Sequence, residues 1–233
     1  NEALFTENVI TAFKACEEND ILMTLGIEPS NPNTGYGYIR YKDSENEIKE
    51  VINFTEKPDL ETAKKFLKEG DYLWNAGIFV WSIKSVLTAF ENSLGEMFSL
   101  FNQGVTYFNS SKEDLFIEEN YGLAENVSID YGIMEGAKNV YVLPVDFGWN
   151  DLGTWGALYD KLEKDQHQNA VVNAKVYSED SFKNMISTQQ GKRVVMKGLE
   201  NFIIVDTQDT LLILPKENEQ EIRTLSQELK TLP

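Results

Sequence analysis

The chain has 233 residues, of which 42% are apolar and 25% are charged, and its formal net charge is −17. This length and apolar content suffice for one large domain with a smaller appendage, while the acidic charge argues against nucleic acid or an anionic membrane as a partner. With one cysteine, Cys16, and one histidine, His167, disulfides and the usual Cys/His zinc or catalytic sites are excluded, so any metal must be a hard ion held by oxygen.

Helix-like and strand-like segments alternate over residues 1–165. The pattern predicts, in chain order, a helix over 1–20, strands over 21–25, 36–41 and 47–57, a helix over 60–70, a strand over 72–81, helices from 82 to about 120, a short helix over 128–136, a strand over 139–145 and a helix after Thr154. Strands interleaved with helices indicate an α/β layer architecture.

The sequence pattern changes near residue 166. Short strand-like runs over 170–176, 193–197, 202–206 and 211–214 alternate with polar turns, and a final helix carries Ile222, Leu225 and Leu229. We therefore predict two parts, residues 1–165 and a small β-rich module over residues 166–233.

The chain contains no apolar run close to the roughly 20 residues that span a bilayer. We therefore expect a cytoplasmic protein without membrane contact. The sequence begins at Asn1 with a segment that already has the periodicity of an amphipathic helix, so we also expect it to be part of a longer protein.

The stretch FTEKPD, residues 54–59, places opposite charges side by side. Pro58 is expected to force Lys57 into an extended conformation, with the side chains of Glu56 and Lys57 on opposite faces or splayed by a bulge. Glu56 can then accept hydrogen bonds from sugar hydroxyls while Lys57 supplies a point charge for a phosphate. The alternative is an ordinary surface ion pair before a proline turn.

Two other stretches set glycine within strand-like sequence. In TGYGYI, residues 34–39, Gly37 lets the backbone approach a ligand closely, although a turn that enters a hairpin is the ordinary explanation. In WNAGIF, residues 74–79, Asn75 and Gly77 interrupt an apolar strand. A buried asparagine requires partners, which are either backbone neighbours or a bound hydroxyl.

A lone aspartate, Asp151, lies among two glycines and two tryptophans in FGWNDLGTW, residues 147–155. The glycines allow a sharp turn and the tryptophans can exclude water, so Asp151 is a candidate hard ligand. Magnesium takes only one or two protein carboxylates when phosphates and waters complete its octahedron. The alternative role is a helix cap, which Thr154 can already fill.

Taken in order, the stretches GIEPSNPNTGYGYI, FTEKP, WNAGIFVW with SIDYGIMEG, and FGWNDLGTW resemble the mannose-1-phosphate guanylyltransferase family, also called GDP-mannose pyrophosphorylase. Each stretch is weak alone, but their order and spacing are specific and cover nearly the whole chain. The tail, from DSFKNM to LLIL, is similar to the end of that family, a left-handed β-helical module involved in dimer contacts. The resemblance implies a Rossmann-like nucleotide-diphospho-sugar transferase domain, present in part, followed by this module.

The resemblance also implies an activity, the transfer of GMP from GTP to α-D-mannose 1-phosphate with release of pyrophosphate. Magnesium and positioning carry such a reaction without a side-chain nucleophile. By the match, Asp151 is a catalytic magnesium ligand, Glu56 grips the mannose hydroxyls, Lys57 faces the sugar phosphate, and Gly37 and Asn75 line the sugar pocket. The implied partners are mannose 1-phosphate, GTP and a second copy of the chain, bound through the C-terminal module.

The chain departs from the family pattern at one point. The family begins with a G-x-G-x-R-x-x-P-type loop that holds the triphosphate, and no such loop occurs in these 233 residues. We therefore expect residues 1–165 to be the sugar-phosphate-binding part of the domain, inactive alone. Strands that pair with the remaining part are expected to leave an exposed sheet edge.

Three rival interpretations remain open. Another sugar-1-phosphate nucleotidyltransferase fits the E-K-P stretch and the aspartate equally, because base-selecting residues lie elsewhere. A non-catalytic sugar-phosphate-binding or assembly module fits the missing loop. A glycosidase is weaker, because Glu56 and Asp151 come with a lysine and no second acid at a motif-like position.

Overall fold

The computed structural model describes residues 1–230 and consists of two compact units, Asn1–Trp149 and a second that begins at Asn150. This division assigns the helix after Thr154 to the second unit, whereas the sequence pattern placed it in the first part, 1–165. The first unit contains α1 Glu2–Glu18, β1 Leu22–Ile27, β2 Tyr38–Tyr41, β3 Lys49–Thr55, α2 Leu60–Glu69, β4 Tyr72–Trp81, α3 Ile83–Ser93, α4 Gly95–Asn102, α5 Glu113–Asn120, a 3₁₀ turn Tyr121–Leu123, a π-helix Asp130–Met134 and β5 Val140–Pro144.

The five strands of the first unit form a closed sheet in the order β1-β4-β2-β3-β5. Strand β1 is antiparallel to β4 and parallel to β5, and β2 is antiparallel to both β3 and β4. The sheet closes where β3 meets β5, with Lys49 opposite Val142 and Glu50 opposite Tyr141. The predicted exposed edge is therefore wrong for this sheet, because β3 and β5 satisfy one another.

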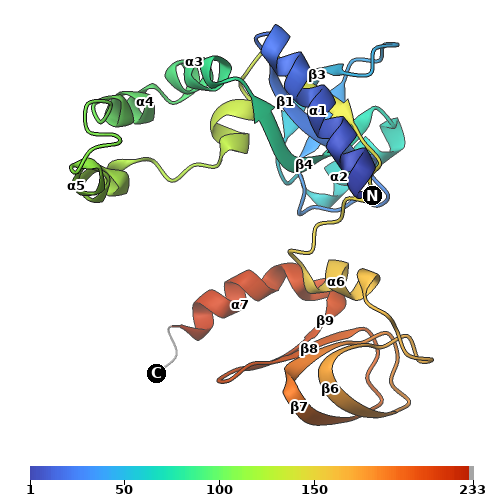
Figure 1. Ribbon diagram of the computed structural model, residues 1–233. Helices are drawn as coiled ribbons and strands as arrows, with labels where there is room; N and C mark the ends of the chain where they lie inside the picture. Colours follow the sequence, from blue (N-terminus) through green and yellow to red (C-terminus); the bar gives the residue numbers. More distant parts are fainter. Residues whose placement is uncertain (231–233) are drawn as a thin grey trace. The chain divides into compact units, whose positions relative to one another are not determined.

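Alternation along β1 builds two cores on opposite faces of the sheet. Met23 and Leu25 pack with Cys16 of α1, which lies along one face (Figure 1). Leu22 packs on the other face with Ile133 and neighbouring buried residues of the π-helix and β5. Thr24 is fully buried on this second side of β1, and its hydroxyl is therefore available to side chains of β4 rather than to α1.

Helix α2 follows the start and stop signals in the sequence. The Asp59 carboxylate accepts from the Thr62 backbone N–H at 2.8 Å, and Gly70 ends the helix in the left-handed conformation at φ 78°. The buried face of α2 carries Phe66, which stacks on Tyr72 of β4 at 4.0 Å between ring centroids. This packing holds α2 against β4.

The second unit contains α6 Trp155–Lys161, β6 Ala170–Glu179, β7 Met185–Lys197, β8 Phe202–Asp206, β9 Leu211–Pro215, a 3₁₀ segment Lys216–Glu221 and α7 Ile222–Leu229. Strands β6, β7 and β8 are parallel neighbours, with Ala170 opposite Met185 and Met185 opposite Ile203, and β9 returns antiparallel. Stacked parallel strands of this kind form a β-helix-like module, as expected. The handedness of its coils stays a prediction.

Buried asparagines hold the coils together. Asn169 and Asn184, 15 residues apart, are 1% and 0% exposed, and the Asn184 Nδ2 donates to the Asn169 Oδ1 at 3.0 Å. The Asn184 Oδ1 in turn accepts from the Phe202 backbone N–H at 2.9 Å, 18 residues further on. One polar side chain per coil thus pairs with the next coil, which satisfies groups that burial alone would leave costly.

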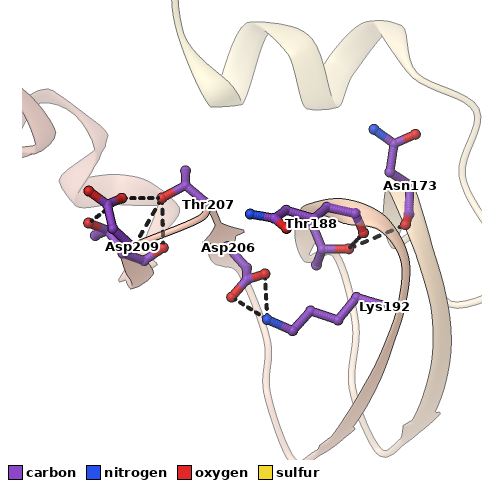
Figure 2. Close-up of polar contacts among 8 residues, drawn as sticks. Asn173, Thr188, Lys192, Asp206, Thr207 and Asp209 are labelled. Atoms are coloured by element: carbon purple, nitrogen blue, oxygen red, sulfur yellow. Dashed lines mark hydrogen bonds and ion pairs between the residues drawn. The ribbon is translucent and has the colours of Figure 1, made fainter.

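Polar contacts also join the coils near the surface (Figure 2). The Lys192 ammonium donates to both oxygens of Asp206, at 2.7 and 2.6 Å, and thereby ties β7 to the end of β8. The Thr188 hydroxyl donates to the Asn173 carbonyl at 3.3 Å and links β7 to β6. These contacts connect consecutive strands of the module.

No helix within residues 1–230 has the length and apolar character that a membrane span requires.

Candidate functional site

Three of the predicted sugar-site residues meet at one point of the first unit. The Asn75 backbone N–H of β4 donates to the Gly37 carbonyl at 2.8 Å. A Cβ added at Gly37 would meet the Glu56 Oε2, so a larger residue there would require the Glu56 side chain to shift, and Glu56 lies directly against this glycine. The sequence thus correctly grouped Gly37, Glu56 and Asn75, although they come from three separate strands or strand ends.

Lys57 joins this group in a conformation that differs from the prediction. Its φ is 45°, in the left-handed region, so the expectation of an extended Lys57 with a splayed side chain is wrong. The Lys57 N–H donates to the Tyr36 carbonyl at 3.2 Å, and this tertiary contact holds the turn in place of the extended backbone that Pro58 favours. A non-glycine residue in this region is strained, which is common at functional sites.

The side chains of Glu56 and Lys57 form an ion pair, with 2.5 Å between Oε1 and Nζ. The Glu56 side chain is 7% exposed and that of Lys57 is 56% exposed, so the lysine covers the carboxylate from the solvent side. The hydrogen bond that Lys57 donates to the Glu56 carboxylate raises the pKa of Lys57, and the nearby Tyr131 and Asp130 reinforce the effect. The lysine is therefore a permanent cation within reach of an anionic ligand.

Asn75 has the partners that a strand asparagine requires. Its Oδ1 accepts from the Thr24 hydroxyl at 2.8 Å and from the Gly77 N–H at 3.1 Å, while its Nδ2 donates to Asp130 Oδ1 at 3.0 Å. Gly77 has φ 69°, so the glycine permits the bulge that returns its N–H to the amide.

Sequence reasoning missed three residues of this site. Thr24 and Asp130 hold Asn75, and Glu135 accepts from the Glu56 backbone N–H at 3.1 Å. Asp130 and Glu135 lie in the stretch SIDYGIMEG, which carried the resemblance without a role for either acid. Two acids in a short stretch that also carries the buried Ile133 and Met134 were the signal that could have found them.

Aromatic rings line the approach to the site. Tyr36 packs edge to face against Trp74 at 5.0 Å and against Trp149 at 5.6 Å between ring centroids. Trp149 therefore belongs to the aromatic surroundings of the segment around Gly37, while its predicted role in excluding water from Asp151 stays a prediction. Trp155, the other tryptophan of the motif, packs instead with the core of the second unit around Tyr159.

Asp151 lies in the second unit, in a tight turn. Its Oδ1 accepts from the Gly153 N–H at 2.7 Å, and a side chain at Gly153 would lie 2.8 Å from that oxygen. Thr154 caps α6, with its hydroxyl accepting from the Ala157 N–H at 3.2 Å, so Asp151 is not needed as the cap. The role of Asp151 as a metal ligand stays a prediction.

Asp151 supplies a single carboxylate, which suits a hard cation whose other ligands are phosphates and water. Within the described part of the chain there is no group of three or more His, Cys, Asp or Glu side chains that could cage a metal. A single aspartate at a glycine turn is compatible with magnesium, because that ion usually takes one or two carboxylates and completes its octahedron with phosphates and water.

The closed sheet, with Gly37, Glu56 and Asn75 in contact on neighbouring strands or strand ends, can be compared with known proteins. Residues 4–168 match the family model described as nucleotidyl transferase, and residues 175–229 match that of the MannoseP isomerase/GMP-like beta-helix domain. The chain belongs to the nucleotidyl transferase family, with a β-helix-like module at its C-terminal end. The resemblance stated from the sequence is thus confirmed.

Similarity to individual proteins is more specific than the match to the family model. The chain is 32% identical over 232 residues to the mannose-1-phosphate guanylyltransferase RfbM of Salmonella typhimurium, covering 99% of this chain and 48% of the relative. It is 34% identical to the xanthan biosynthesis protein XanB of Xanthomonas campestris, covering 99% and 49%. The chain thus spans about half the length of these curated relatives.

A solved structure supports the same placement. The crystal structure described as a mannose-1-phosphate geranyltransferase from Thermus thermophilus matches with a TM-score of 0.83 and 27% identity. The match covers 99% of this chain and 66% of that one. Both units of the present chain therefore have counterparts in one solved relative.

Proposed function

We propose that this chain provides the sugar-phosphate site of a mannose-1-phosphate guanylyltransferase, which transfers GMP from GTP to α-D-mannose 1-phosphate and releases pyrophosphate. The observation that carries the proposal is that Gly37, Glu56, Lys57 and Asn75 lie together: the Glu56 carboxylate lies against Gly37 and pairs with Lys57, and the Asn75 N–H donates to the Gly37 carbonyl. The names of the relatives add support, since several are mannose-1-phosphate guanylyltransferases.

In this proposal the Glu56–Lys57 pair opens when substrate arrives. The sugar phosphate replaces Glu56 as the partner of the Lys57 ammonium, and the released Glu56 carboxylate accepts hydrogen bonds from sugar hydroxyls. The backbone at Gly37 permits close approach of the ring, and Asn75 offers an amide to a further hydroxyl. A phosphate oxygen of the bound sugar then attacks the α-phosphorus of GTP in line as pyrophosphate leaves.

Positioning is the main contribution of these residues. The carboxylate and the ammonium together recognise a molecule with hydroxyls at one end and an anion at the other. Asp151 would hold magnesium, which when bound supplies charge neutralisation between the phosphates of the two reactants. Fixing two anionic reactants in line converts a bimolecular encounter into a reaction within one complex.

The chain is proposed to bind sugar phosphate without turning it over. Its 233 residues contain no match to the triphosphate loop of the family pattern, so nucleotide transfer requires a segment in addition to them. Calorimetry with mannose 1-phosphate, with and without GTP and magnesium, tests this. We expect binding without turnover by the chain and GDP-mannose formation by the complete enzyme.

The same titration separates the rival functions. Glucose 1-phosphate is the matched control, because it differs from mannose 1-phosphate at one hydroxyl. Clearly tighter binding of glucose 1-phosphate would favour another sugar-1-phosphate nucleotidyltransferase. Binding without turnover in the complete protein would favour a non-catalytic module, and no binding of either sugar would contradict the proposed site.

We also propose a homodimer through the C-terminal module. A groove of about 710 Å³ lies between β9 and α7 of the second unit, and its walls carry Leu211, Ile213, Leu225 and Leu229, which are 38–60% exposed. Apolar surface of this kind marks contact sites on soluble proteins. Sedimentation equilibrium tests the proposal. Leu225→Asp should shift the mass towards monomer, and an unchanged monomeric mass for the unaltered chain would contradict it.

A further inference from the structure

We infer that the π-helix Asp130–Met134, together with the adjoining Glu135, positions the sugar-binding groups, and that Asp130 fixes the orientation of the Asn75 amide. The inference rests on the proposed function for the identity of the ligand. Asp130 is a positioning residue in this scheme, because it acts through Asn75 and not on the substrate.

The contacts of Asn75 define which end of its amide is nitrogen. A carboxylate oxygen accepts hydrogen bonds, so the group that meets Asp130 Oδ1 at 3.0 Å must be the Nδ2 donor. The Thr24 hydroxyl and the Gly77 N–H donate to the opposite end. Rotation of the amide by half a turn would set its NH₂ group against the Gly77 N–H and its oxygen against the Asp130 carboxylate. The second Nδ2 hydrogen of Asn75 therefore has a fixed direction.

A second carboxylate of the same segment holds the other side of the site. Glu135 Oε1 accepts from the Glu56 backbone N–H at 3.1 Å. The Glu135 N–H closes the π-turn on the Asp130 carbonyl at 3.0 Å, and Ile133 and Met134 are 0% and 1% exposed. A short, anchored segment thus contacts both β4 and the turn after β3. π-Helical turns of this kind occur frequently at functional sites.

The charge of Asp130 acts in the same direction. The hydrogen bond that Lys57 donates to Glu56 is the largest cause of its raised pKa, and the charge of Asp130 is a smaller one. The segment therefore helps to keep the phosphate-binding ammonium charged while it orients the neutral amide. One element serves the anionic and the hydroxylated ends of the proposed ligand.

The first test needs no ligand. The side-chain amide protons of Asn75 can be assigned in NMR spectra by their loss in Asn75→Ala. In Asp130→Ala we expect these signals to shift and to exchange faster with water, whereas Asp130→Asn, which retains an acceptor oxygen, should stay close to the unaltered protein. Asp114→Ala, on the exposed surface of α5, is the control. Unchanged Asn75 signals in Asp130→Ala would overturn the inference.

The second test measures binding of mannose 1-phosphate by calorimetry. Asp130→Ala should raise Kd about tenfold, in line with the loss of one orienting hydrogen bond, and Asp130→Asn about threefold or less. In a double-mutant cycle, Asp130→Ala should add little to Asn75→Ala, because it acts through that amide. Additive losses would show a general structural effect and contradict the positioning role.

The two tests fail separately. If the unaltered protein binds no sugar 1-phosphate while the Asn75 signals respond to Asp130→Ala, the proposed function is wrong and the positioning contact stands. If binding is normal and neither the signals nor Kd responds, the positioning role is wrong and the proposed function stands. Thermal melting of each variant shows that the fold is intact.

Discussion

Two lysine–carboxylate pairs, one in each unit, look alike but differ in their surroundings. Glu56 and Asp206 have side chains that are 7% and 11% exposed, while their partners Lys57 and Lys192 are 56% and 53% exposed. Lys192 takes up both oxygens of Asp206. Lys57 bonds Oε1 of Glu56, whose Oε2 lies against the backbone of Gly37.

We interpret the difference as that between a proposed binding site and a structural contact. Around Asp206 the pair joins β7 and β8 of the β-helix-like module, and Lys192 contacts both carboxylate oxygens. Around Glu56 the pair adjoins Gly37, against which the carboxylate lies, and Asn75, whose amide has one N–H beyond its bond to Asp130. Burial of a carboxylate beside a lysine therefore says little about function until the groups next to it are known.

The largest predicted effect is a loss of kcat on substitution of Asp151, a residue of the second unit. Asp151 lies in the otherwise structural second unit, yet we predict a chemical role for it. In the complete enzyme, Asp151→Asn should lower kcat by a few hundredfold, about the size of losing one preorganised charge-stabilising group. Steady-state kinetics over a range of magnesium concentrations checks this, with Asp206→Asn as the control. An unchanged kcat with magnesium still tightly bound would remove Asp151 from the mechanism.

Removal of a buried asparagine from the polar network of the second unit should lower the stability of the protein. Asn184 is fully buried and bonds to Asn169, Leu199 and Phe202. Asn184→Ala leaves these groups unpaired and should cost about 3 kcal/mol in the free energy of unfolding. Denaturant unfolding measures this, with the exposed Gln190→Ala of the same strand as control. A loss below about 0.5 kcal/mol, the range of neutral surface changes, would contradict the structural role.

The two lysines provide the direct comparison between the units. Lys57→Ala should raise the KM for sugar phosphate about tenfold and leave GTP affinity nearly unchanged, because it removes one charge-assisted contact. Lys192→Ala should leave both values unchanged and cost at most about 1 kcal/mol of stability. Kinetics of both variants in the complete enzyme measures the contrast. Weaker GTP binding in Lys57→Ala would show that the role assignment is reversed.

The smallest effect concerns Cys16 in the core of the first unit. Burial raises the pKa of its thiol from 9.0 to about 11, although a hydrogen bond with the Met23 backbone partly offsets this. The pKa of the thiol is higher in the folded than in the unfolded protein. Its contribution to the free energy of unfolding is therefore fully present below about pH 9 and is lost as the pH rises towards about 11. Thermal melts between pH 8 and 11 should show this decline, and Cys16→Ala should lack it. Equal declines in both proteins would exclude the thiol as the cause.

Local features of the fold were predictable from the sequence. Helix α2 begins at Asp59 and ends before Gly70 because both signals act on adjacent backbone groups. The strand pattern likewise predicted β4 at its observed bounds. Closure of the sheet was not predictable, because β3 and β5 are distant in sequence and their pairing depends on the whole unit.

The site was predictable as residue types but not as a network. The structure brings Gly37, Glu56, Lys57 and Asn75 together, which the family resemblance implied and the separate stretches did not show; their roles in binding stay predictions. The conformation of Lys57 was predicted wrongly, because the local preference before proline yields to its contact with Tyr36. Asp130 was missed because it lies 55 residues from Asn75 and only the folded chain brings them together.

A crystal structure of the protein with bound mannose 1-phosphate is the most direct measurement. We predict that the phosphate contacts the Lys57 ammonium in place of Glu56, and that the mannose hydroxyls contact Glu56 and Asn75 beside Gly37. A sugar phosphate bound elsewhere, with the Glu56–Lys57 ion pair intact, would contradict the assignment of the sugar-phosphate site to these residues.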